Sequence, residues 1–349
     1  MKRFVNRRSN LRPSRQRGYV LVMTIAALAL LTMAGAYISQ QITTAIRLAA
    51  AEQAYTEQER QARDELARII YTLSTTKRSP IGIGSDAVAI RLDGRWYDTG
   101  GKIAVSLQDA RGLVNLRTAE RTTTEQLLVG YGVPINRTAA LIDALEDYVD
   151  ADSLRRLQGA EADDYKEKKL LPPRNLPLVS TQELQRVYGW KDEASLWGGG
   201  GILDNTVLAD ETGLNPATAT WRTLVATLKM SEQDAKSLIA AREGLDAIAM
   251  AQLVKPIVGQ FSGADLLKIH TPVLFPAMTT VITLAPKGGQ FGWRATFTIT
   301  PDQHTNTWLL KDFHEIALDK TVPEGGLPPL PDVSPFATNI LEEQKAITF

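Results

Sequence analysis

Carboxylates are the most chemically capable side chains of this sequence, and they are concentrated in one segment. Residues 146–167 read EDYVDADSLRRLQGAEADDYKE, which we expect to form the end of a helix and a following loop. The simplest interpretation is a solvated acidic face. It would be balanced by the neighbouring basic residues Arg155, Arg156, Lys166, Lys168 and Lys169.

Few other side chains could support catalysis. The 349 residues include no cysteine and only three histidines, which rules out disulfides, thiolate metal sites and cysteine nucleophiles,. His314 stands beside Glu315 on a predicted strand, where neighbouring side chains point to opposite faces and cannot act together. The sequence contains no nucleophile elbow, phosphate-binding loop or two-histidine zinc motif. We therefore predict a protein that is not an enzyme.

The N-terminus has the pattern of a membrane anchor. The stretch before Gly18 is basic and has no acidic residue, and charge then disappears until Arg47. Residues 19–40 are apolar, and about 20 apolar residues in a helix cross a bilayer. The basic flank predicts a single-pass protein with a cytoplasmic N-terminus. A secretory signal cleaved near Ala36 is the alternative.

Hydrophobic spacing predicts an α+β fold, in which a long N-terminal helix packs on a small antiparallel sheet. Apolar residues recur at helical intervals to about Thr75. Alternating residues predict strands within 88–108, with an Asp93-Gly94 turn, and again within 279–316. Between them the chain looks helical, which indicates a large inserted helical domain. The predicted parts are a leader 1–18, a transmembrane helix 19–40, a first αβ part 41–117, the insertion 118–277, C-terminal strands 278–317 and a disordered Pro/Gly-rich tail 318–349.

The predicted insertion contains a repeat. The sequence NLRTA at 115–119 recurs as NPATA at 215–219, and each copy precedes a predicted helical hairpin,. The first hairpin breaks at GYGVP, residues 130–134, which is similar to helix-hairpin-helix modules that grip DNA phosphates through backbone amides. An acidic second helix, and totals of 39 basic and 39 acidic residues, argue against DNA,. We predict no nucleic-acid binding and treat a type IV pilus-like or DNA-uptake component as the alternative function.

The junction of Arg17 and Gly18 with the apolar stretch resembles a prepilin leader, which prepilin peptidase cuts after glycine. The resemblance implies a mature chain that keeps the apolar helix and starts at an N-methylated Tyr19. Most pilin-like subunits carry Glu at mature position five, where this chain has Met23. A carboxylate in the membrane needs a neutralising partner. Its absence predicts a subunit with no neighbour ahead of it, and a lipid-facing Met23 in a generic anchor is the alternative.

A series of short motifs follows the first repeat copy. They are DAD at 150–152, GAE at 159–161, Tyr165, PP at 172–173 and STQEL at 180–184, the last with the spacing of a capping box,. In this order they resemble the K-type minor pseudopilins of type II secretion, and the resemblance runs from the leader to about Ile316.

That resemblance implies a subunit at the tip of a periplasmic filament, which it starts or caps during export of folded proteins across the outer membrane. The implied partners are the I- and J-type minor pseudopilins, the H-type and major pseudopilins, prepilin peptidase and the inner membrane. The resemblance also implies calcium, held by Asp147, Asp150, Asp152, Glu161 and Asp163. Ser153 and Ala162 stand where the family often has Asp, so we expect weak binding. The solvated acidic face stays open as the alternative.

Overall fold

The computed structural model describes residues 19–85, 88–258, 272–300 and 307–333. The chain divides into two compact units, residues 1–57 and 58–349. The predicted leader, with Gly18, lies outside the described residues.

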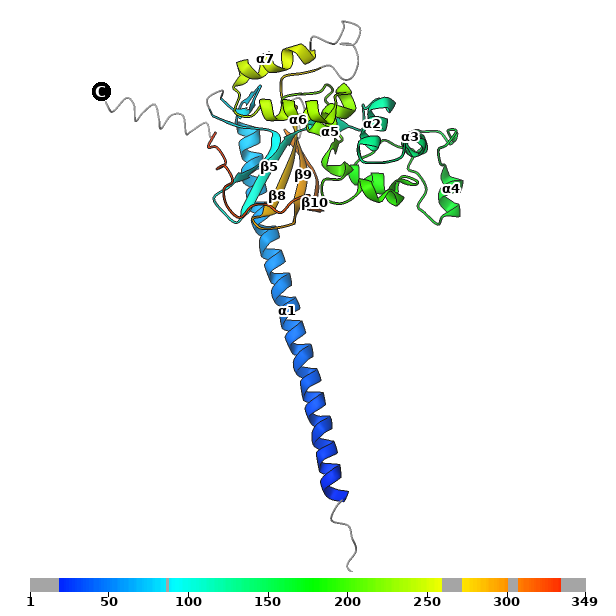
Figure 1. Cartoon of the computed structure of the whole chain (residues 1–349), viewed down its shortest axis with the longest axis vertical. Helices are drawn as coiled ribbons and strands as arrows, with labels where there is room; N and C mark the ends of the chain where they lie inside the picture. Colours follow the sequence, from blue (N-terminus) through cyan, green and yellow to red (C-terminus); the bar gives the residue numbers. More distant parts are fainter. Residues whose placement is uncertain (1–18, 86–87, 259–271, 301–306, 334–349) are drawn as a thin grey trace, which may run out of the picture. The chain divides into compact units, whose positions relative to one another are not determined.

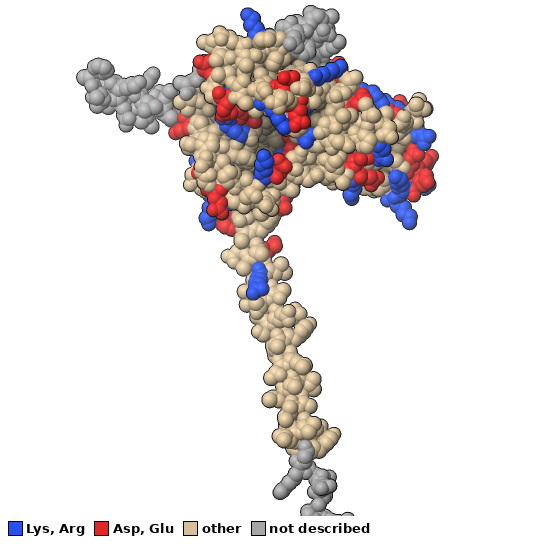
Figure 2. Space-filling model, viewed as in Figure 1, with Lys and Arg blue, Asp and Glu red and all other residues tan. Residues whose placement is uncertain are grey.

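Helix α1, Tyr19–Thr75, makes up the described part of the first unit and continues into the second (Figure 1). Among the described residues it is the one helix that is long and apolar enough to cross a membrane,. Its surface is uncharged before Arg47, which Figure 2 shows as a tan stretch. The Thr24 hydroxyl donates to the Leu21 carbonyl at 2.8 Å, so it needs no water in an apolar setting,.

The second unit is built around a five-stranded antiparallel sheet. Its strands, in spatial order, are β10 (Trp308–Ala317), β9 (Phe291–Ile299), β8 (Thr279–Pro286), β5 (Ile103–Asp109) and β4 (Asp93–Asp98). Strands β5 and β8 are central neighbours paired from Ile103↔Pro286 to Asp109↔Thr280. The long chain between them contains helices, short 3₁₀ helices and loops, so the predicted α+β class with a helical insertion is confirmed.

The end of α1 supplies one side of the sheet's core. Ala62, Leu66, Ile69 and Leu73 are buried at spacings of three and four residues, which places them on one helix face,. The Arg63 guanidinium lies 4.2 Å from the centre of the Phe313 ring on β10. The helix ends at Thr75, as the apolar spacing predicts.

The segment after α1 differs from its prediction. Strands β1 (Arg78–Ser79), β2 (Gly82–Gly84) and β3 (Ala89–Ile90) form a separate small sheet. The predicted Asp93-Gly94 turn is wrong, because both residues belong to β4, whose pairing with β5 is irregular between Asp93 and Trp96. The hairpin signal is overridden by a bulge. Gly82 has a φ of 151°, and a Cβ there would lie 2.0 Å from the Ile90 carbonyl oxygen, so only glycine fits,.

The insertion contains the two predicted hairpins. Its helices are α2 (Arg121–Gly130), α3 (Ile135–Val149), α4 (Ala162–Glu167), α5 (Trp221–Leu228), α6 (Glu232–Ala241) and α7 (Ala247–Val258). Short 3₁₀ helices are η1 (Ala110–Gly112), η2 (Thr181–Arg186), η3 (Trp190–Asp192), η4 (Ala194–Leu196) and η5 (Ile202–Asp204). Helix α2 packs on α3, α5 on α6, and α2 on α5, so the first helices of the two hairpins meet.

The repeated asparagines build the same turn twice. The Asn115 side-chain oxygen accepts from the Arg117 amide, and the Asn215 side-chain oxygen accepts from the Ala217 amide. The side-chain nitrogens of the two asparagines donate to different partners. Asn115 donates to the Ala209 carbonyl, whereas Asn215 donates to Asp109 at the end of β5. Short parallel strands β6 (Val114–Asn115) and β7 (Thr206–Val207) lie beside the first turn.

The tail prediction is wrong for residues 318–333. Val322 is 1% exposed and belongs to a small core with Ala104 and Ala285 of the sheet. The Leu330 amide donates to the Asp98 carbonyl at 2.8 Å, so this part of the tail continues the edge of β4. Residues 334–349 lie outside the described part.

Candidate functional site

The carboxylate segment is positioned by helix α3 and a loop that folds back over it. Leu141, Leu145 and Tyr148 of α3 are buried in the largest core of the insertion. Asp143, Asp147 and Asp150 leave the helix beside this apolar face, at spacings of four and three residues,. Tyr148 is fully buried, which fixes the end of the helix from which the carboxylates project.

The returning loop binds the helix carboxylates through its backbone. The Gln158 amide donates to Asp143 Oδ2 at 3.0 Å, and the Arg156 amide donates to Asp147 Oδ2 at 3.2 Å. A Cβ on Gly159 would lie 1.9 Å from Asp147 Oδ2. The glycine of the GAE motif is therefore needed for the loop to approach α3 so closely.

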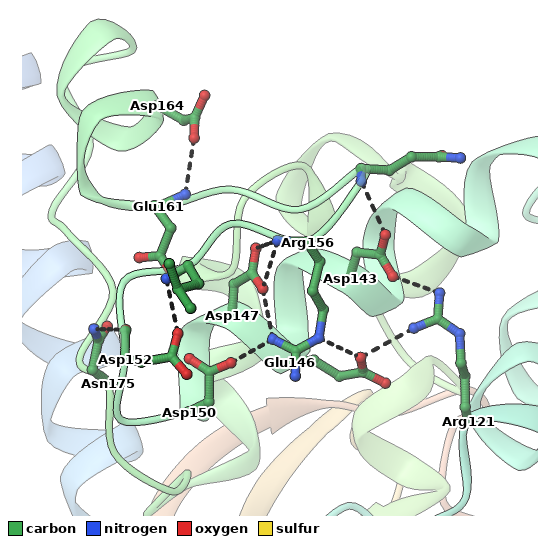
Figure 3. Close-up of polar contacts among 12 residues, drawn as sticks. Arg121, Asp143, Glu146, Asp147, Asp150, Asp152, Arg156, Glu161, Asp164 and Asn175 are labelled. Atoms are coloured by element: carbon green, nitrogen blue, oxygen red, sulfur yellow. Dashed lines mark hydrogen bonds and ion pairs between the residues drawn. The ribbon is translucent and has the colours of Figure 1, made fainter.

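Three carboxylates come together where the loop crosses the end of α3. One oxygen each from Asp150, Asp152 and Glu161 lies within 4.8 Å of the other two. Figure 3 shows these three side chains close together. Burial raises the pKa of Glu161, and the charges of Asp147, Asp150 and Asp152 raise it further,. Like charges at this separation repel one another unless a cation or a proton joins them.

Several oxygens at this place have no hydrogen-bond partner among the residues that the structure describes. Asp150 Oδ1, Glu161 Oε1 and Asn175 Oδ1 are all buried and unpartnered. Asn175 is tied to the group because its amide nitrogen donates to the Asp152 carbonyl at 2.7 Å. Buried acceptors without donors are costly. Carboxylate and amide oxygens are also the ligands that calcium takes, so the donor set fits a calcium ion.

The five residues assigned to calcium from the sequence do not all belong to this group. Asp147 is fully buried and its carboxylate contacts Arg156, whose Nη1 lies 2.7 Å from Asp147 Oδ1. Arg156 also pairs with Asp150 and, through Nε, with Glu146 at 2.8 Å. Asp163 is exposed on α4 and is not among the three grouped carboxylates. The structure therefore brings together Asp150, Asp152 and Glu161, with Asp147 behind them.

Sequence reasoning missed two residues of the site. Asn175 lies in the sequence PPRNLPL, residues 172–178, where nothing in the pattern marks a ligand. Its positive φ of 51° belongs to the folded loop and cannot be read from the sequence. The solvated-face interpretation puts Arg156 on the surface, whereas its side chain contacts the carboxylates and is 37% exposed.

The capping box expected at Ser180 forms only in part. Ser180 is the N-cap of η2 and its hydroxyl accepts from the Gln182 amide. Glu183, however, accepts from the Val179 amide and pairs with Arg174 at 2.7 Å.

In the loop that resembles a DNA-binding hairpin, the amides of the turn itself are bonded within the protein. The amides of Tyr131, Gly132 and Val133 donate to the α2 carbonyls of Leu127, Val129 and Leu128 at 2.8–3.2 Å. A phosphate at these turn amides would have to displace these bonds, whereas the first turn of α3 has no side-chain cap. The same helix carries Asp143, Glu146 and Asp147, which would repel a phosphate,. The geometry does not favour the DNA-uptake alternative.

Tyr19 and Met23, the residues singled out in the anchor, lie in the first turns of α1. Both are exposed, at 71% and 56% respectively, and their neighbours in the helix are apolar.

Comparison with known proteins finds a protein family that matches part of this chain. Residues 105–195 match the family model described as type II secretion system (T2SS), protein K. That range contains the first repeat copy, helix α3 and every carboxylate of the site. The resemblance to K-type proteins is therefore confirmed by this match.

A solved structure also resembles the chain. It is described as the crystal structure of the GspK-GspI-GspJ complex from the enterotoxigenic Escherichia coli type 2 secretion system. The match has a TM-score of 0.46 at 14% identity, and covers 77% of this chain and 99% of the other. A comparison with curated proteins found no match.

Proposed function

We propose that this chain is a K-type minor pseudopilin that starts or caps a type II secretion filament. The observation that carries the proposal is the protein K match over residues 105–195, which fall in and around the helical insertion of an α1-plus-sheet fold. The role is structural, and no catalytic step is proposed.

The proposed partners are other pseudopilins. The I- and J-type minor subunits come first, because the resembling crystal structure is described as a complex of GspK with GspI and GspJ. The H-type and major pseudopilins follow from the tip position. Assembly would occur through the apolar surface of α1, since helices in lipid associate by side-by-side packing.

The anchor supports a single crossing of the inner membrane, with the second unit in the periplasm. Prepilin peptidase would cleave after Gly18 and leave an N-methylated Tyr19. Met23 replaces the usual Glu, so this subunit would offer no carboxylate to the amine of a subunit ahead of it,. The bulk of the insertion at the tip would then limit further growth of the filament.

The proposed cofactor is calcium, held by Asp150, Asp152 and Glu161, with Asn175 Oδ1 as a further oxygen ligand. The support is the three carboxylates within 4.8 Å and the buried unpartnered oxygens among them. When bound, the ion supplies positive charge that offsets their repulsion. In the chain itself, Asn175 and Asp152 hold the loops 151–158 and 168–179 together through the hydrogen bond between them.

Co-purification tests the function. The full-length chain would be expressed with its cognate I- and J-type minor pseudopilins, solubilised from membranes and captured through a tag on the J-type partner. We expect the chain to co-purify with both partners, whereas an unrelated single-span protein made in the same cells should not. Capture of the J-type partner without this chain, when both are folded, would contradict the proposal.

A further inference from the structure

The insertion exposes aliphatic side chains beside the carboxylate group. Leu154 is 78% exposed and Leu157 is 92% exposed in the loop that returns over α3. A second loop follows α4 and exposes Leu170, Leu171 and Leu176 at 46%, 68% and 55%. We call these five residues the leucine edge. Exposed apolar groups of this number on one small region indicate an interaction surface.

The two loops lie next to each other. The Asn175 side chain of the second loop donates to the Asp152 carbonyl of the first at 2.7 Å, and Figure 3 shows both residues together. Arg155 of the first loop pairs with Asp164 of α4 at 3.1 Å. The five leucines therefore belong to one connected part of the insertion.

Basic residues flank the leucines of the leucine edge in the sequence. Arg155, Lys166, Lys168 and Lys169 are all exposed. Figure 2 shows that both signs of charge gather on this end of the insertion, around α4. Six basic and six acidic residues stand between 150 and 174, so their charges balance in the sequence. A divalent cation on the carboxylates would leave this region positive.

We propose that the leucine edge inserts into an anionic lipid surface. Leucines that protrude from a loop among lysine and arginine residues combine apolar insertion with attraction to acidic headgroups. A protein partner is less well matched, because protein interfaces are enriched in aromatic residues. The segment 150–179 has a single aromatic residue, Tyr165, and it is fully buried.

The carboxylate group would control the presentation of the edge. The Leu154 amide donates to Asp152 Oδ1 at 2.8 Å, and Arg156, between Leu154 and Leu157, pairs with Asp147 and Asp150. Calcium at this group would thus bind next to the loop that carries Leu154 and Leu157. This part of the inference rests on the proposed calcium site, and lipid binding is expected to be stronger in calcium than in chelator.

A vesicle-capture experiment tests the inference on the full-length chain. The protein is held by α1 in phosphatidylcholine nanodiscs, which satisfies the anchor. It is then floated with separate liposomes of phosphatidylcholine alone or mixed with phosphatidylglycerol, in calcium or in chelator. We expect capture by the phosphatidylglycerol liposomes in calcium and little capture by phosphatidylcholine.

Variants identify the surface that binds. The double change Leu154→Asp and Leu157→Asp should lower capture by about tenfold. The matched control changes Ile135 and Ile248 to Asp, because these residues are similarly exposed, at 70% and 72%, elsewhere in the insertion. Each variant must keep the wild-type melting temperature and its co-purification with the I- and J-type partners. That second readout separates failure of this inference from failure of the proposed function.

Three results would overturn the inference. They are no capture by phosphatidylglycerol liposomes, equal capture by phosphatidylcholine liposomes, and capture unchanged by the leucine variants. Variants that no longer join their partners would instead count against their own folding, and milder changes of the same leucines to Ser would replace them.

Discussion

Arg156 Nη1 lies 2.7 Å from Asp147 Oδ1, so a guanidinium occupies one side of the carboxylate group. Asp147 is fully buried, and Arg156 also contacts Asp150. The Arg156 guanidinium is thus a positive charge supplied by the loop itself, and it partly offsets the repulsion among the acidic residues. The remaining carboxylates, Asp152 and Glu161, are those on the side away from the arginine. This arrangement leads to the predictions that follow.

Arg156→Ala should destabilise the insertion. The change leaves Asp147 buried without its ion pair, and loss of one partner of a buried pair typically costs 3–5 kcal/mol. Since Arg156 is 37% exposed and partly screened by water, we expect about 2 kcal/mol,. Calcium should recover part of the loss. Urea unfolding of the detergent-solubilised chain measures it.

Arg155→Ala is the matched control, because that residue pairs at 3.1 Å on a surface where it is 56% exposed. Its change should cost no more than about 0.5 kcal/mol. Equal losses in the two variants would show that Arg156 has no special contact with the carboxylates.

Calcium should raise the melting temperature of the wild-type chain. Asp150→Asn and Glu161→Gln should each remove most of that rise, because they delete a charged ligand at the centre of the group,. Asp163→Asn should keep it, since Asp163 is exposed and outside the group. Thermal unfolding in calcium and in chelator provides the measurement. An unchanged wild-type melting temperature would favour the solvated acidic face.

The calcium effect should weaken on acidification. The pKa of Glu161 is raised by burial and by neighbouring carboxylates, so protons compete with calcium at a higher pH than at an ordinary glutamate,. Without calcium, the titration of Glu161 should have the opposite effect, and acidification should stabilise the folded chain. The folded chain holds this proton more tightly than the unfolded chain, so Glu161's contribution to stability falls as pH rises from its ordinary pKa through the raised one.

Melting temperatures across this pH range, with and without calcium, measure both effects. Glu161→Gln should flatten both trends. If the wild type and this variant respond alike to pH, Glu161 is not the group that titrates.

Asp109 should be essential for joining the insertion to the sheet. Its carboxylate is fully buried, and burial raises its pKa. It accepts from the Asn215 side chain, the Thr218 hydroxyl and the Ala277 amide at 2.8–2.9 Å. Asp109→Ala leaves these donors unpaired, at a cost of about 3 kcal/mol.

Asp98→Ala is the control for Asp109, because Asp98 pairs with Lys287 on the surface and is 32% exposed. Its loss should leave the midpoint of denaturation close to that of the wild type, because an exposed ion pair contributes little to stability. Denaturant unfolding followed by tryptophan fluorescence compares the two. A cost for Asp109→Ala as small as for Asp98→Ala would mean that other contacts hold the insertion in place.

Local patterns were sufficient for the parts of the fold that depend on periodicity. The end of α1 at Thr75 and the presence of strands within 88–108 and 279–316 follow from apolar spacing, although β4 begins at the predicted turn,. The tail was misjudged because its Pro/Gly composition masks one buried residue, Val322, whose partners Ala104 and Ala285 are distant in sequence. A single apolar residue has no period to detect.

The candidate site was predictable as a segment but not as a set of ligands. The DAD and GAE motifs locate Asp150, Asp152 and Glu161. Which carboxylates meet, and that Arg156 takes Asp147, depends on how the loop folds over α3. Asn175 enters through a loop with no sequence signal, since its role comes from one hydrogen bond to a backbone carbonyl.

The N-terminus of the protein isolated from membranes is the most direct test of the pseudopilin account. Mass spectrometry of the terminal peptide should show a methylated Tyr19, which means that the leader is removed and α1 is kept. A mature chain that starts beyond Ala36, or one that still carries its first eighteen residues, would contradict the account.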